Sequence, residues 1–170
     1  MNLVKIDKVT LNIGVGAPGE KLENAKALLE KISGSKAVLT KAKARNPNFK
    51  IRKGDDIGVK VTLRKQVSID VLKRCLDALD FSLSQNNFDS TGNLSFGVKE
   101  YIDVPGMRYD PKIGMSGFDV AVSLVKQGIR VQRRRVAFSR IPRSQRVSKI
   151  EAIEFMKSLG VMLKEDEVSQ

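Results

Sequence analysis

The chain has no histidine, no tryptophan and a single cysteine, Cys75, among its 170 residues. One cysteine cannot form an internal disulfide or a multi-cysteine metal site, and without histidine the usual zinc ligand and the usual general base are both missing. The sequence also lacks a run of about 18 apolar residues, the length that spans a membrane, and its alternating N-terminus is not typical of a signal peptide. We therefore expect a cytoplasmic protein with no membrane contact, metal or cofactor.

Acidic residues are missing from two long segments. The net charge is +12, from 31 basic and 19 acidic residues. Residues 31–54 carry eight basic residues and residues 126–149 carry nine, with no acid in either, so the remainder of the chain has a net charge of −5. A charge run is often only a solvated face, but like charges packed together destabilise a fold. Their segregation therefore indicates an anionic partner, and nucleic acid fits best because each neutralised phosphate releases a condensed counterion.

Apolar residues alternate with polar ones in some segments, which is typical of half-buried strands, and recur at helical spacing in others. The expected strands are residues 6–15, 37–42, 57–64, 94–102 and 118–125. The expected helices are residues 19–33, ending at Gly34; residues 69–81, with Ser68 as N-cap; and residues 149–159, opened by a capping box of Ser148 and Glu151 and closed by Gly160.

This order of elements predicts an α+β fold, in which an antiparallel β-sheet has helices packed on one face and the other face open for RNA, plus a basic C-terminal extension. We expect an RNA-binding core over residues 1–125. Residues 126–170 would form a basic segment and a C-terminal helix packed on or flanking the same domain, with a frayed end at 164–170. Open sheet faces are common platforms for RNA, and this one would display Thr10, Asn12, Lys60, Thr62 and Arg64.

The stretch GVGAPG at residues 14–19 matches the G-x-G-x-x-G pattern of a dinucleotide-binding turn. It follows an expected strand and opens an expected helix, as that pattern requires. The same fingerprint needs an acid about 20 residues onward to hold the ribose, whereas no acid occurs between Glu30 and Asp55. A nucleotide-dependent enzyme is therefore kept only as an alternative, and a simple turn is the preferred interpretation.

Other candidate reactive groups have simpler interpretations. Cys75 lies near the apolar side of its helix, with no histidine to activate it, and is assigned to the core. The neighbouring Asp55 and Asp56 diverge on an extended segment, which favours a solvated turn over a metal-binding pair. Tyr101 and Tyr109 could stack on bases, but only nine residues are aromatic. Stacking is therefore not expected to be the main mode of binding.

Four stretches, in order, resemble one family. They are LNIGVG (11–16), TKAKARNPNFKIRKGDDIGVKVTLR (40–64), FDSTGNLSFGVKE (88–100) and RYDPKIGMSGFDVAV (108–122). Together they are similar to the large-subunit ribosomal protein family that binds 5S rRNA, the fifth of the large-subunit proteins. The stretch RIPRSQRVSKIEAIEFM (140–156) resembles its archaeal and eukaryotic branch.

The resemblance implies a structural, non-catalytic constituent of the large ribosomal subunit. Such a protein would bind 5S rRNA in the central protuberance beside other ribosomal proteins and contact the P-site tRNA and the small-subunit head. Carried over by motif, the family's strand asparagine and strand threonine fall on Asn12 and Thr62. Its turn after the first helix falls on Ser35, where bacterial members have glutamine. A general DNA or RNA binder outside the ribosome stays open as an alternative.

The implied residues form three groups. For 5S and large-subunit rRNA they are Asn12, Ser35, Lys36, Thr40, Lys60, Thr62, Arg64, Arg133, Arg134 and Arg135. In the loop facing tRNA they are Lys41, Lys43, Arg45, Asn46, Asn48, Lys50, Arg52 and Lys53. Within this loop Phe49 is expected to be an anchor into the core, with stacking on a base as the alternative. At the bridge to a small-subunit head protein they are Tyr109, Asp110, Lys112 and Met115.

Overall fold

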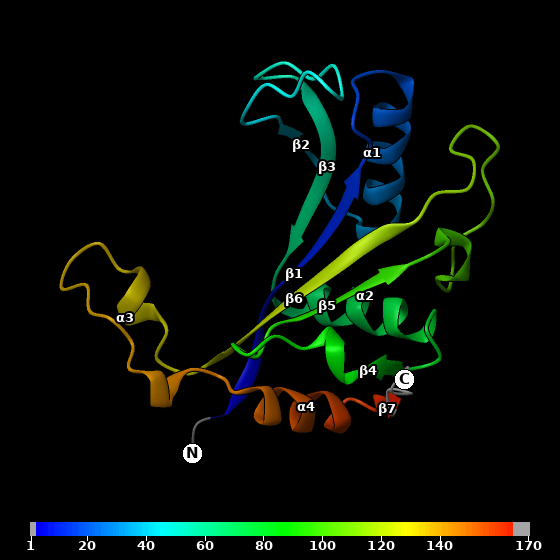
Figure 1. Cartoon of the computed structure of the whole chain (residues 1–170). Helices are drawn as coiled ribbons and strands as arrows, with labels where there is room; N and C mark the ends of the chain where they lie inside the picture. The colour runs from blue at the N-terminus through cyan, green and yellow to red at the C-terminus, as the bar shows by residue number, and fades with distance from the viewer. Residues whose placement is uncertain (1–2, 165–170) are drawn as a thin grey trace, which may run out of the picture.

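The structure is a computed structural model that describes residues 3–164. A five-stranded antiparallel sheet has the strand order β2-β3-β1-β6-β5, and a parallel pair of short strands, β4 and β7, lies beside it (Figure 1). The strands are β1 (Val4–Gly14), β2 (Val38–Lys41), β3 (Asp56–Leu63), β4 (Ser82–Ser84), β5 (Leu94–Val98), β6 (Phe118–Lys126) and β7 (Met162–Lys164). The helices are α1 (Glu20–Ser33), α2 (Lys65–Asp77), α3 (Arg130–Arg133) and α4 (Lys149–Ser158). The α+β expectation is confirmed.

The core lies between one face of the sheet and the helices α1 and α2. Val9 and Leu11 of β1 are fully buried there, as is Leu29 of α1. Cys75 of α2 is also fully buried, and burial raises the pKa of its thiol to about 12, so its assignment to the core is confirmed. The C-terminal helix α4 adds Met156 to the same apolar cluster.

The ends of α1 and α4 agree with the sequence. Gly34 has a left-handed φ of 62° and its N–H donates to the carbonyl of Glu30, as a helix C-cap does. At the start of α4, the Ser148 hydroxyl accepts from the Glu151 N–H, and the Glu151 carboxylate accepts from the Ser148 N–H. This reciprocal capping box is the one that the sequence predicted.

The limits of α2 were predicted wrongly. The helix begins at Lys65 and ends at Asp77, and Ser68 lies inside its first turn. The Ser68 hydroxyl donates to the Lys65 carbonyl at 2.6 Å, so it does not cap free N–H groups. The helix stops early because the next turn contains consecutive left-handed residues, Asp80 and Phe81.

One further boundary differs from the expectation, and two short strands were not foreseen. The strand expected over 94–102 ends at Val98, because Tyr101–Asp103 forms a 3-10 turn in which Tyr101 is buried. The short strands β4 and β7 were not predicted. Apart from Lys164, the end that was expected to be frayed lies outside the described residues.

Candidate nucleic-acid interface

The face of the sheet opposite α1 and α2 is lined by polar and small side chains. Register places Asn12 of β1 between Lys60 of β3 and Asp119 of β6, and the next row places Thr10 opposite Thr62. Lys60, Thr62 and Asp119 are exposed, whereas the alternate residues of the same strands are buried. Figure 1 shows α1 and α2 together on one side of the sheet. The sheet therefore offers a surface of hydrogen-bonding side chains that these two helices leave uncovered.

The fold brings five of the expected rRNA contacts onto or beside this open face. Asn12 and Lys60 are cross-strand neighbours, and Thr40 of β2 lies opposite Gly58 of β3. Thr62 lies near the end of β3, and Arg64 is the first residue after that strand. Ser35 and Lys36 lie in the turn between α1 and β2. The remaining three, Arg133, Arg134 and Arg135, lie in the segment that follows β6.

Residues 41–53, called here the cationic hairpin, connect β2 to β3. Ala42 donates its N–H to the Asp55 carbonyl at 2.8 Å, and Asn46 and Ile51 exchange two backbone hydrogen bonds of 2.9 and 3.0 Å. At the tip, the Asn46 side-chain oxygen accepts from the Asn48 N–H at 3.2 Å. The six basic side chains of the hairpin are all exposed, namely Lys41, Lys43, Arg45, Lys50, Arg52 and Lys53.

Phe49 corrects one expectation about this hairpin. Its side chain is 73% exposed at the tip and does not anchor the loop in the core. The tip is held instead by its own backbone hydrogen bonds. The expected turn is present at Asp55, whose carboxylate accepts from the Arg52 N–H at 2.8 Å. For Asp56 the expectation of a solvated turn is wrong, because this residue begins β3 and its Oδ1 is buried without a hydrogen-bond partner among the described residues. Within residues 3–164, no cluster of three or more acidic or cysteine residues could hold a metal ion.

The segment that carries the expected bridge residues is fastened to α1. Lys31 of α1 contacts the Asp110 carboxylate at 2.6 Å, and Asn24 of α1 donates to the Lys112 carbonyl at 2.8 Å. The hydrogen bond from Lys31 is the main reason that the pKa of Asp110 lies below its ordinary value of 3.8. Tyr109 and Met115 remain exposed beside these contacts. The segment is therefore held against α1 while the side chains of Tyr109 and Met115 stay accessible.

Residues 127–147, called here the cationic arm, follow β6 and include α3. Arg133 forms a two-pronged ion pair with Asp7 of β1, with N–O distances of 2.8 and 2.6 Å. This pairing is the main cause that lowers the pKa of Asp7 from 3.8. Arg134 donates to the Ala137 carbonyl at 2.7 Å. Of the three arginines of this arm that were expected to contact rRNA, only Arg135 has no side-chain hydrogen bond or ion pair within the described residues.

A second ion pair closes the base of the cationic arm. Lys126, the last residue of β6, has only 6% of its side chain exposed, and its ammonium lies 2.7 Å from the Glu151 carboxylate of α4. Hydrogen bonding from Lys126 is the main reason that the pKa of Glu151 lies below its ordinary value of 4.5. The arm is therefore held at its base by Glu151 and along its length by Asp7.

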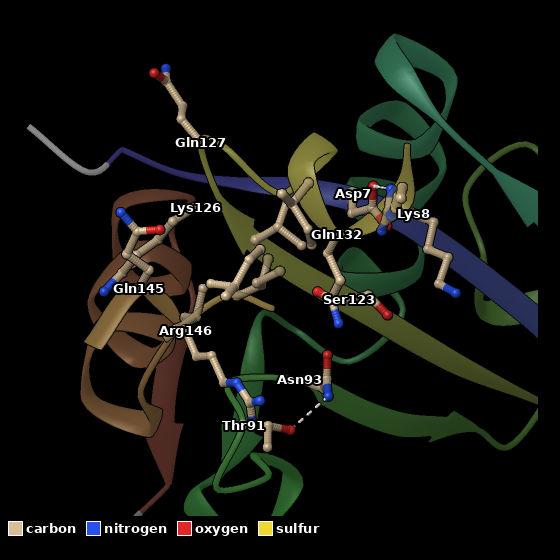
Figure 2. A pocket seen from close by; sticks show the side chains of 16 residues that line it. Asp7, Lys8, Thr91, Asn93, Ser123, Lys126, Gln127, Gln132, Gln145 and Arg146 are labelled. Atoms are coloured by element: carbon tan, nitrogen blue, oxygen red, sulfur yellow. Dashed lines mark hydrogen bonds and ion pairs between the residues drawn. The ribbon is translucent and has the colours of Figure 1, made fainter. Parts of the chain in front are cut away.

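A cavity of about 390 Å³ lies between the cationic arm and the sheet (Figure 2). Its lining includes Asn93, Ser123 and Gln132, which sequence analysis did not single out. No sequence pattern links these neutral polar residues to one another, and only the fold brings them together from distant parts of the chain. Asp119, on the open face, was missed in the same way, because one acid inside an alternating strand carries no separate signal.

The GVGAPG turn does not have the surroundings of a dinucleotide site. The N–H groups of Val15 and Gly16 both donate to the Ile57 carbonyl, at 3.0 and 2.8 Å, so they are not free for a phosphate. Both neighbours of β1 run antiparallel to it, whereas a dinucleotide fold has parallel strands at this point. The structure therefore supports the simple-turn interpretation. Among residues 3–164, no helix has the length and apolar character to cross a membrane.

Comparisons with known proteins cover nearly the whole chain. A family model described as Ribosomal protein L5 matches residues 1–52, and a second model, described as the C-terminus of the same ribosomal family, matches residues 56–159. Three curated relatives carry the name Large ribosomal subunit protein uL5. The protein of Sulfolobus acidocaldarius is 49% identical over 157 residues (92% of this chain and 88% of the relative). That of Pyrobaculum aerophilum is 47% identical over 164 residues (96% and 92%), and that of Sulfurisphaera tokodaii is 48% identical over 158 residues (92% and 89%).

Proposed function

This chain belongs to the ribosomal protein L5 family, and from that premise we propose that it is a non-catalytic constituent of the large subunit of the cytoplasmic ribosome that binds 5S rRNA. The observation that carries the proposal is the open face of the sheet. Asn12, Lys60 and Thr62 form adjacent hydrogen-bonding positions there, and α1 and α2 pack on the opposite face. A sheet face of this kind suits RNA, because bases and riboses can lie flat on it and reach its side chains.

The positions of the exposed basic side chains support our assignment of the contacts with tRNA and large-subunit rRNA. The cationic hairpin extends from β2 and β3, so its exposed lysines and arginines lie at one end of the proposed 5S rRNA surface, where we assign the P-site tRNA contact. We assign the cationic arm to large-subunit rRNA, since Arg135 is free to bind a phosphate. The segment 109–115 would meet a protein of the small-subunit head through Tyr109 and Met115. Other proteins of the central protuberance would adjoin these surfaces.

Asp119 favours one orientation of RNA across the open face. A carboxylate repels phosphates but accepts hydrogen bonds from ribose 2′-hydroxyls and from exocyclic amino groups of bases. Asp119 lies on β6, whereas Lys60 lies two strands away on β3, and Asn12 lies between them. RNA bound across this row would therefore place phosphates nearer β3 and riboses or base edges nearer β6.

The test is competition between 5S rRNA and RNAs of equal length and different sequence, combined with footprinting of the protein on 5S rRNA. Thr62→Val or Asn12→Ala should weaken binding to 5S rRNA about fivefold, since one hydrogen bond contributes about 1 kcal/mol. The dependence of this binding on salt should hardly change. Lys60→Gln should reduce the salt dependence, whereas Lys73→Gln on the exposed side of α2 should not. Equal affinity for all RNAs would contradict the proposal and favour a general RNA-binding protein.

A further inference from the structure

The cavity between the cationic arm and the sheet is large enough for a small planar ligand. Its volume of about 390 Å³ falls in the range of roughly 300–1,000 Å³ that is typical of small-molecule sites. Its walls come from β1 and β6, from the turn at 91–93 before β5, and from the cationic arm. Because the arm forms one wall, the cavity exists only while the arm is docked on the sheet.

Neutral hydrogen-bonding groups converge inside this cavity. Figure 2 shows the side chains of Asn93, Ser123 and Gln132 gathered around one space, each from a different element. The Asn93 amide nitrogen donates to Thr91 at 2.9 Å, which leaves its oxygen to face the cavity. Within residues 3–164, the Gln132 side chain has no hydrogen-bond partner. Two amides and a hydroxyl offer the donors and acceptors that match the edge of a nucleobase.

Apolar side chains complete the walls. Ile129 and Ile141 of the cationic arm line the cavity, together with Val147 at the end of the arm. Such side chains contact the flat face of a base, while amides and hydroxyls read its edge, as in sites that hold an unstacked base. A wholly charged ligand would leave these apolar walls without a partner.

Positively charged side chains around the cavity favour a phosphate group next to the base. Arg146 and Lys8 also line the cavity, and the nearby carboxylate of Asp7 is already paired with Arg133. In Figure 2, Arg146 extends beside the cavity toward Thr91. The surroundings are therefore cationic, which suits a phosphate next to a base that lies inside.

We propose that this cavity binds one unstacked nucleotide of RNA, with its base against Asn93, Ser123 and Gln132 and its phosphate on Arg146. The choice of RNA rests on the proposed function. The site adjoins the open face of the sheet, since Ser123 follows Asp119 and Ala121 on the same side of β6. It differs from that face because it would hold a single extruded base, not the surface of a folded RNA. Unstacked bases are what sequence-specific RNA-binding proteins most often read.

The experiment titrates the 170-residue chain with AMP, GMP, CMP and UMP, each in turn, and follows side-chain amide signals by NMR. At least one nucleotide should shift the signals of Asn93 and Gln132 and saturate with a Kd on the order of 1 mM or tighter. Ribose 5-phosphate, which has no base, should leave them in place. Gln127 is the matched control, because it lines the same cavity but its side chain points away in Figure 2.

Variants separate base recognition from charge. Gln132→Ala should weaken nucleotide binding about fivefold or more, the effect of losing one hydrogen bond, whereas Gln127→Ala should leave it unchanged. The inference is overturned if no nucleotide shifts these signals at about 10 mM, well above the expected Kd. It is also overturned if ribose 5-phosphate shifts them equally.

Binding of 5S rRNA is measured with the same preparation, so that failure of this inference can be told apart from failure of the proposed function. If 5S rRNA binds selectively and no nucleotide binds, only the cavity assignment fails. If nucleotides bind and 5S rRNA is not preferred over other RNA, the proposed function fails and the cavity assignment stands.

Discussion

Gly92 lies where the turn before β5 touches the end of the cationic arm. Its φ is 75°, and a Cβ atom there would lie 2.6 Å from Val147 Cγ1. Gly92→Ala should therefore destabilise the protein by about 2–4 kcal/mol, from backbone strain together with overpacking. Gly128→Ala is the control, because Gly128 also has a positive φ but no atom within 4 Å of such a Cβ. Urea unfolding of both variants measures the difference, and equal losses would contradict the assigned contact.

Replacement of Phe49 tests how much this exposed aromatic side chain contributes to the free energy of unfolding. Because its side chain lies outside the core, Phe49→Ala should change the free energy of unfolding by no more than about 0.5 kcal/mol. The buried Phe96, in contrast, should cost about 3–5 kcal/mol when replaced by alanine. Chemical denaturation of the two variants provides the measurement. A large loss at Phe49 would restore the expectation of a core anchor.

At the residue scale, sequence predicts a side chain's role where a pattern repeats and fails where a residue stands alone. Asn12 and Thr62 were placed on the open face because alternation runs through β1 and β3. Phe49 was misplaced because its hydrophobicity does not reveal that a hairpin holds it beyond reach of the core. Asn93, Ser123 and Gln132 could not be grouped at all, since they meet only when β6 and the arm have folded together.

Two elements, β6 and α4, are joined by the pair of Lys126 and Glu151. Glu151→Gln keeps the shape of the side chain but leaves the buried Lys126 ammonium without a counter-charge, which should destabilise the protein by about 1–3 kcal/mol. Glu154→Gln, on an exposed position of the same helix, should change stability by no more than about 0.5 kcal/mol. Thermal and urea unfolding of the two variants compare these losses. Matching results would show that the ion pair contributes nothing.

The cationic hairpin should act through its number of phosphate contacts. If Lys41 and Lys43 each neutralise one RNA phosphate, each change to glutamine should lower the slope of log K against log salt by about 0.7–0.9. Lys73→Gln on α2 should leave the slope unchanged. Binding to 5S rRNA and to tRNA, measured over a series of salt concentrations, tests this directly. Slopes that stay constant in both lysine variants would remove the hairpin from the interface.

Among the elements, long alternating strands and capped helices were predictable, and short or irregular ones were not. The capping box at Ser148 gave the start of α4 because both partners are readable from sequence. The start of α2 was missed because its N-cap residue, Arg64, makes no side-chain cap, so the nearby Ser68 looked like a better candidate. β4 and β7 contain three residues each, too few for any periodic pattern to be recognised.

The whole molecule should lose stability in acid. Asp7 and Glu151 both have a folded pKa below the ordinary value, so their ion pairs stabilise the fold above those ordinary values of 3.8 and 4.5. That contribution is lost as the pH falls through the lower folded pKa values. The free energy of unfolding should therefore decrease between about pH 5 and pH 3, and less steeply in Asp7→Asn. Urea titrations across this range provide the measurement, and a parallel decrease in wild type and variant would contradict it.

At this scale the sequence predicted the separation of charge and the antiparallel sheet, but not how the C-terminal part is held. Residues 126–149 were recognised by their composition, whereas the ion pairs to Asp7 and Glu151 depend on contacts between distant segments. Ala152 and Met156 share the core of the sheet. This supports our proposal that the C-terminal part, as far as Lys164, belongs to the same domain as the core; residues 165–170 lie outside the described residues.

The ion pair of Arg133 with Asp7 has one more consequence. The Asp7 carboxylate occupies the guanidinium fork in the way that a phosphate would, so under the proposed function it competes with RNA phosphates for Arg133. A nucleic acid gains from Arg133 only where its phosphate fits the fork better than Asp7 does. The arm should therefore bind unrelated polyanions more weakly than its number of arginines suggests. Competition from Asp7 favours a partner whose phosphate fits the guanidinium geometry.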